Sequence, residues 1–219
     1  PARRIRESLV EILMRKATDI ARGSISGGLD DASVRGPGIL RGVCFLVLLT
    51  ILFSGSLNAN AQSGSSREYQ IKAIFLAKFA GFVPWPPAAF SDRSTPVVIG
   101  VLGDDPFGKY LDEAIRGEKV NGRSLVAQRF DSVDEMKQCH VLFISKSERR
   151  KVEEIFDKLR GMSVLTVGET RRFADDGGMI NFVLAGKNVR FEINADAASR
   201  EKLKLSSKLL RLGKIVKGK

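Results

Sequence analysis

The most chemically suggestive segment of this sequence is Gly103-Asp104-Asp105-Pro106-Phe107-Gly108-Lys109-Tyr110, which has the G-x-x-x-x-G-K spacing of a phosphate-binding loop. Tyr110, however, stands where that motif needs a Ser or Thr hydroxyl to hold Mg²⁺. Asp104 and Asp105 would repel a phosphate, and Pro106 lacks one of the N–H donors that would cradle it. We therefore interpret the segment as a tight turn followed by a capped helix starting at Pro106.

The residue types give little support for a nucleophilic catalytic site or a metal site. The one histidine, His140, directly follows Cys139 at the start of an apolar run, and neighbouring residues of a strand point to opposite faces. A Cys–His dyad is therefore excluded, and His140 is interpreted as structural. The acidic pairs 104–105 and 175–176 are typical of turns. The sequence predicts no catalytic residue, no metal site and no cofactor. A measured hydrolase activity that is lost in His140→Ala would instead support an enzyme.

The N-terminal region has the order of a secretory signal. Arg35 and Arg41 precede the apolar run Val43 to Phe53, which is 11 residues long, and a small-x-small site, Ala59-Asn60-Ala61, follows. The run is too short for a bilayer, which needs ~20 apolar residues. We predict residues 1–61 to be an extension and signal peptide cleaved after Ala61, and residues 62–219 to be one domain. Residues 1–38 are set aside as an over-extended start or a long n-region.

The charge of the exported part lies at its C-terminal end. The chain carries a formal net charge of +11, yet residues 62–199 contain 20 basic and 19 acidic residues. Residues 200–219 contain eight basic residues and one acidic residue. A body without a basic stripe, in an exported protein, excludes nucleic acid as the partner.

The pattern along residues 62–219 predicts a three-layer α/β sandwich with a mixed, mainly parallel sheet. Apolar runs alternate with helical patterns, which is typical of strands buried on both faces. A C-terminal antiparallel hairpin follows, with Ala185-Gly186-Lys187 as its loop. We expect strands at 97–102, 125–130, 141–144, 164–167, 179–184 and 189–193, and helices at 67–81, 106–115, 133–137, 148–159, 170–174 and 203–216.

Three features are candidate partner-binding surfaces. Phe82 and Trp85 belong to a proline-rich aromatic loop, which is either a lid over the first helix or a binding platform. Arg190 and Glu192 alternate with apolar residues and form the exposed face of a strand. The tail forms a helix with a basic stripe, which either docks on the sheet with a solvated edge or contacts anionic lipid or an acidic partner. The basic stripe consists of Lys204, Lys208 and Arg211.

Several segments in one order resemble the YfiR family, from about Glu68 to Val216. The segments are Tyr69 to Ala73, Phe82-x-x-Trp85-Pro86, Ile99 to Gly108, Cys139 to Ile144, Val164 to Gly168, Gly177 to Phe182, Arg190 to Asn194 and Leu205 to Leu210. Some members of that family carry disulfide-forming cysteine pairs, whereas only Cys139 follows Ala61 here. Redox-dependent behaviour is therefore not expected.

The resemblance implies a non-enzymatic periplasmic regulator. The best-understood members of that family bind the periplasmic domain of an inner-membrane diguanylate cyclase and hold it inactive, and an OmpA-like outer-membrane lipoprotein sequesters them. We expect this chain to repress a membrane-bound cyclase or sensor kinase in that way, and so to control cyclic di-GMP and biofilm output. The sequence leaves undecided whether the protein forms a homodimer. The alternative is a periplasmic small-molecule binding module, with its site beyond the strand ends near Gly103, Ser145 and Gly168.

Overall fold

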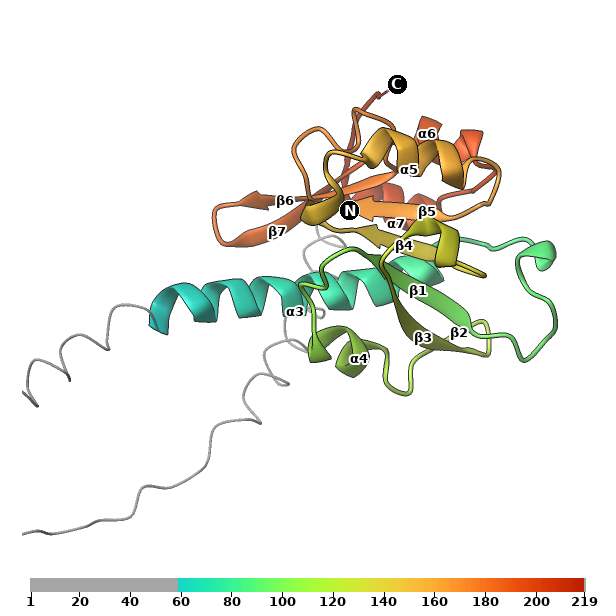
Figure 1. Cartoon of the computed structure of the whole chain (residues 1–219), viewed down its shortest axis with the longest axis horizontal. Helices are drawn as coiled ribbons and strands as arrows, with labels where there is room; N and C mark the ends of the chain where they lie inside the picture. Colours follow the sequence, from blue (N-terminus) through green and yellow to red (C-terminus); the bar gives the residue numbers. More distant parts are fainter. Residues whose placement is uncertain (1–58, 219) are drawn as a thin grey trace, which may run out of the picture.

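The computed structural model describes residues 59–218, which form an eight-stranded sheet with helices on both faces (Figure 1). The strand order is β2-β3-β1-β4-β5-β6-β7-β8. The strands are β1 (Val97–Leu102), β2 (Lys119–Val120), β3 (Arg123–Phe130), β4 (Val141–Ile144), β5 (Leu165–Gly168), β6 (Ile180–Ala185), β7 (Asn188–Ile193) and β8 (Lys214–Ile215).

Five of the strand pairs are parallel, and only β2–β3 and β6–β7 are antiparallel. The parallel strands β1, β4 and β5 are buried along their whole length, which explains their continuously apolar sequences. The predicted α/β fold, its mainly parallel sheet and its antiparallel hairpin are confirmed.

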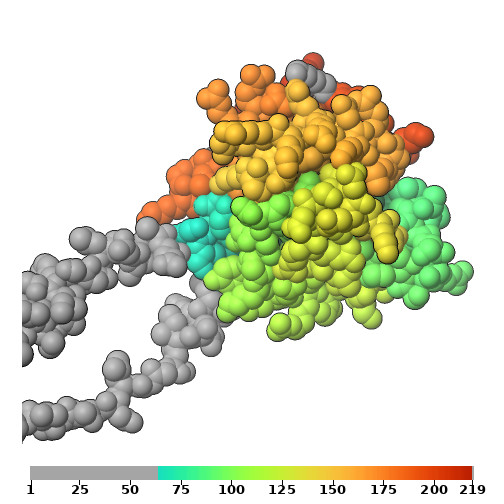
Figure 2. Space-filling view, in the orientation of Figure 1, coloured from blue at the N-terminus to red at the C-terminus, as the bar shows by residue number. Residues whose placement is uncertain are grey.

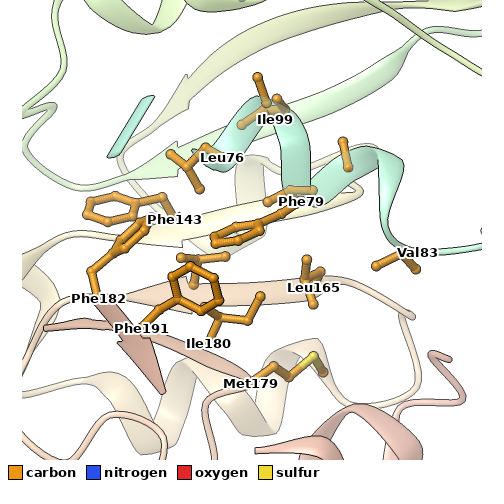
Figure 3. Packing of buried hydrophobic residues seen from close by; sticks show 14 of the residues in the cluster. Leu76, Phe79, Val83, Ile99, Phe143, Leu165, Met179, Ile180, Phe182 and Phe191 are labelled. Carbon is orange, nitrogen blue, oxygen red and sulfur yellow. The ribbon is translucent and has the colours of Figure 1, made fainter. Parts of the chain in front are cut away.

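One face of the sheet is covered by α3 (Ala59–Gly81) and α4 (Lys109–Ile115). Leu76 and Phe79 of α3, and Val83 just after it, belong to one apolar cluster with Ile99 and Phe143 of the sheet (Figure 3). Full burial of a side chain such as Phe79 contributes about 2–3 kcal/mol. The helix ends at Gly81, and Pro84, shortly after it, could not continue the helical hydrogen bonding.

The first helix starts earlier than predicted. We expected a cap at Ser65 or Ser66 and a helix from Arg67, but α3 already begins at Ala59. Alanine and glutamine before those serines favour helix, so the serines do not stop it. The predicted cleavage site therefore lies in the first turn of α3. The apolar run Val43 to Phe53 lies outside the described residues, and within 59–218 no helix is long and apolar enough to cross a membrane.

The opposite face carries α5 (Val152–Leu159) over a second apolar cluster. Short 3₁₀ turns accompany it at η2 (Val133–Glu135) and η3 (Lys146–Glu148). The predicted helix at 170–174 is wrong, because residues 171–177 form turns. Phe173 of this segment packs against Gly168 and Gly178, whose missing side chains leave room for its ring.

The C-terminal segment departs most from prediction. In place of one helix over 203–216, the chain forms α6 (Ala195–Arg200), α7 (Ser207–Leu212) and then β8 beside β7. Asn194 caps α6 and Ser206 caps α7, each accepting a backbone N–H with its side chain. Leu209 is fully buried, so tertiary packing holds this short helix.

Candidate functional site

The segment with phosphate-loop spacing is a structural turn. The Asp105 carboxylate accepts the N–H groups of Phe107 and Gly108, at 2.7 and 3.3 Å. Gly108 has a φ of 51°, so α4 begins only after it, three residues later than predicted. Arg129 binds both Asp105 and Asp112 and joins this turn to α4. The donors that a phosphate would need are thus used within the fold.

The carboxyl ends of β1 and β4, where a parallel sheet offers a ligand crevice, are filled by η3. Ser147 accepts the N–H of Asp104 at 3.1 Å, and a Cβ on Gly103 would collide with its Oγ and lie 2.9 Å from Glu148 Cγ. Ser145 is buried, and its N–H donates to Leu102. Side chains of the protein itself therefore occupy the place where the small-molecule alternative expected its site.

A buried ionic cluster lies where α3 crosses the carboxyl end of β5. Lys72 is 2% exposed and forms ion pairs with Glu68 and Glu169. Tyr69 donates its hydroxyl to Glu169 Oε1 at 2.9 Å, and Lys146 Nζ approaches the same oxygen at 3.4 Å. Burial and the negative charge of Glu169 raise the pKa of Tyr69. We call Glu68, Tyr69, Lys72, Lys146 and Glu169 the ionic cluster.

Of this cluster, only the pair Glu68–Lys72 is visible in the sequence, through its i,i+4 spacing on the first helix. Glu169 directly follows the buried strand β5, and a carboxylate at that position was the signal that could have found it. Each oxygen of Glu169 has a donor within the cluster. The hydrogen bonds and ion pairs of Glu169 are therefore made within the fold, and they hold α3 on the sheet.

The aromatic loop after α3 packs around His140. It protrudes at the end of the molecule opposite the first turns of α3 (Figure 2). Trp85 donates its indole N–H to Ala80 O at 2.9 Å and meets the imidazole edge-on at 5.4 Å. Phe90 stacks on the imidazole at 4.6 Å, with the Arg123 guanidinium 3.9 Å from the Phe90 ring centre. The indole thus has both polar and aromatic partners in the fold, as the lid interpretation of Trp85 expects.

His140 is held as a neutral, structural side chain. Its Nδ1 accepts the Val98 N–H at 3.1 Å, so Nε2 carries the proton and donates to Ala89 O at 3.1 Å. Burial lowers its pKa below the ordinary 6.5. Cys139 packs in the other apolar cluster, where burial raises the pKa of its thiol to about 12. The two side chains therefore share no reaction site.

The predicted partner-binding residues do not form one surface. Arg190 and Glu192 alternate along β7 with Val189, Phe191 and Ile193, which pack on the α3 face. The side chains of Arg190 and Glu192 thus point to the opposite face. Glu192 also pairs with Lys214 at 3.2 Å and accepts from Asn181.

The tail residues lie on the other side, near the loop after α3. Ser206 donates its N–H to Phe82 O at 3.0 Å, which holds the start of α7 against half-buried Phe82. Lys204, Lys208 and Arg211 are exposed and form no ion pair within residues 59–218. Lys204 precedes α7, so the predicted continuous helical stripe is wrong. We call these three cations the tail surface.

In the part of the chain that the structure describes, no group of three or more His, Cys, Asp or Glu side chains could hold a metal ion. The polar clusters described above use their hydrogen-bonding groups within the fold. Among the predicted residues, only the tail surface and Arg190 present exposed charge that lacks an ion pair within residues 59–218.

Comparison with known proteins gives a family match and partial structural likenesses. The chain is similar to the crystal structure of the ABC domain in complex with L-Trp from Streptococcus pneumoniae, with a TM-score of 0.47 and 10% identity. That likeness covers 66% of this chain and 60% of the other, and it carries no functional argument. The YfiR/HmsC-like family model matches residues 69–214, which include every described strand except the last residue of β8. The chain therefore belongs to the YfiR/HmsC-like family.

Proposed function

We propose that this protein is a periplasmic regulator that binds the periplasmic domain of an inner-membrane diguanylate cyclase, or of a sensor kinase, and keeps that receptor inactive. The observation that carries the proposal is family membership over residues 69–214. The signal-like order before Ala61 supports export. Lower cyclic di-GMP and reduced biofilm output would follow from repression.

In this proposal the protein acts through binding and catalyses no reaction. A binder silences a receptor by having higher affinity for the inactive conformation than for the active one. Buried, internally satisfied polar groups suit this role, because they keep the binding surface rigid. An OmpA-like outer-membrane lipoprotein would relieve repression by competing for the regulator.

The tail surface is the proposed contact with the receptor. These exposed cations have no ion pair within residues 59–218 that binding would break, and they attract an acidic partner over a Debye length of about 8 Å at physiological salt. The adjacent half-buried Phe82 adds apolar area at the edge of that surface. Arg190, on the other face, is then available to a second partner such as the lipoprotein.

The test is capture of receptors from the cell envelope by the exported protein. We expect a transmembrane cyclase or kinase to be recovered by the wild-type protein and lost when Lys204, Lys208 and Arg211 are all changed to Glu. The matched control changes three other exposed cations without described ion pairs, Lys137, Arg149 and Arg150, to Glu. Retained capture by the control and loss in the tail variant support the contact.

Cellular output provides an independent check. Deletion of the gene should raise cyclic di-GMP and matrix production, and expression of the wild-type chain should restore both. An unchanged cyclic di-GMP level after deletion would show that the cyclase version is wrong. N-terminal sequencing of the protein from the periplasmic fraction should begin at Gln62 if cleavage follows Ala61.

A further inference from the structure

A cleft lies over β5, between α5 and α6, and it results from the register between β5 and β6. β6 begins beside the carboxyl half of β5, since Ile180 is opposite Val167. The amino half of β5 therefore has no strand on that side. The end of helix α6 lies beside this half of β5 instead of a strand, since Ser163, just before β5, donates its hydroxyl to Glu201 O at 3.2 Å. Both α5 and α6 are short, so they leave part of the sheet face open.

The cleft has a volume of about 560 Å³ and an apolar floor. Phe156 and Leu159 of α5 form one wall, Val164 and Met179 lie on the sheet side, and Ala197 of α6 closes the other wall. Small-molecule sites range from about 300 to 1,000 Å³ and are lined mainly by apolar side chains. Size and lining thus match a compact organic ligand.

The rim of this cleft carries more acidic than basic side chains. Four carboxylates and two guanidinium groups line it: Glu153, Asp157, Asp176 and Glu201, with Arg160 and Arg200. One of the guanidinium groups, on Arg160, is already bound to Asp157 at 2.5 Å. This local excess of negative charge contrasts with residues 62–199 as a whole, which contain 20 basic and 19 acidic residues.

We propose that this cleft binds a small amphipathic cation, with its apolar body on the floor and its amine or guanidinium group at the acidic rim. Charge complementarity selects a cation over a carboxylate, because the rim repels a second negative charge. The apolar floor excludes simple inorganic cations as the matching ligand. This site lies away from the tail surface and goes beyond the proposed function, whose test does not depend on it.

Three probes with one apolar body and different head groups test the proposal: 4-phenylbutylamine, 4-phenyl-1-butanol and 4-phenylbutyrate. Each is titrated into the isotope-labelled exported protein, and binding is followed by amide chemical shifts. We expect the amine to bind about tenfold more tightly than the carboxylate, with the alcohol between them. The largest shifts should map to α5, Met179 and α6.

A matched pair of substitutions on the first turn of α5 isolates the rim charge. Glu153 lines the cleft, whereas Glu154 is exposed beside it and pairs with Lys158 at 3.5 Å. Glu153→Lys should remove the preference for the amine, Glu153→Gln should reduce it, and Glu154→Lys should leave it unchanged. Unshifted amides far from the cleft confirm that each variant is folded.

Three results would overturn the proposal. The first is equal affinity for the amine and the carboxylate. The second is a set of shifts that map outside the cleft, or none up to the solubility limit of the amine. The third is loss of receptor capture by Glu153→Lys together with no amine binding to the wild-type protein, which would assign the cleft to a protein interface.

Discussion

Positive charge occupies two contrasting regions of this protein. In the ionic cluster, Lys72 is 2% exposed and sits between Glu68 and Glu169. In the tail surface, Lys204, Lys208 and Arg211 are exposed and make no ion pair within residues 59–218. The same kind of side chain therefore holds a helix to the sheet in one region and is available to a partner in the other. Burial, and the partners that burial requires, makes the difference.

The largest expected effect comes from breaking the ionic cluster. Lys72→Met should lower the free energy of unfolding by about 3–5 kcal/mol, because Glu169 stays buried without its main counter-charge. The measurement is urea unfolding of the purified protein. The control is Lys78→Met on the same helix, which removes a half-exposed pair with Glu118 and should cost about 1 kcal/mol or less.

The cluster is also testable by a double substitution. Replacing Lys72 by Met and Glu169 by Leu together removes both buried charges and should recover part of the stability lost in Lys72→Met. A single Lys72→Met variant as stable as Lys78→Met would contradict the structural role assigned to the cluster.

The next effect concerns His140, a buried group that stays neutral at pH 7. Its pKa is lowered in the folded state, so below about pH 6.5 the unfolded chain binds a proton that the folded protein does not. Unfolding free energy should therefore fall as pH drops from 6.5, by at most about 1.4 kcal/mol per pH unit. In His140→Gln this part of the pH slope should vanish, as unfolding at pH 7.5, 6.5 and 5.5 will show. Identical slopes would mean that His140 is not responsible.

A smaller effect is expected for Arg129, whose side chain is 36% exposed and bridges Asp105 and Asp112. Arg129→Gln should cost about 0.5–1 kcal/mol at low salt and less in 1 M salt. The Arg129 hydrogen bond lowers the pKa of Asp112, so NMR titration should show that pKa returning toward its ordinary value. A salt-independent loss would point to packing instead of charge.

The smallest stability effect is expected at the tail surface. Changing Lys204, Lys208 and Arg211 to Gln should alter the free energy of unfolding by about 0.5 kcal/mol or less, since these side chains have no partner within the described fold. The same variant should weaken receptor capture and remove its dependence on salt. A loss of several kcal/mol would place these cations among the residues that hold the fold.

Local patterns of apolar residues predicted the strands of the central sheet reliably. The six predicted strands were found within two residues of their expected limits. For β1, β4 and β5 the reason is that a strand buried on both faces must be apolar throughout, whereas β7 was recognised by its alternation of apolar and charged residues. Prediction failed in the tail, where the 3.6-residue spacing of Leu205, Leu209 and Leu212 suggested one helix. Packing of Leu209 and pairing of β8 with β7 divide that segment instead.

The candidate site was predicted only in part. The exposed cations of the tail follow from composition, and the lid interpretation of Trp85 agrees with its contacts to Ala80 and His140. Glu169 and the cleft between α5 and α6 were missed. Both depend on residues far apart in sequence, such as Tyr69 and Glu169, that only meet in the folded chain.

The sequence by itself determined the fold class, the family and the position of the excess charge. Each of these is a property of local pattern or of composition, and none needs the distance between remote residues. The tertiary structure alone decided that Lys72 is buried between two carboxylates, that Arg190 and the tail surface lie on opposite faces, and that a register offset beside β5 leaves an acidic cleft. These are outcomes of strand register and helix packing, which set burial and so decide which charges are used within the fold.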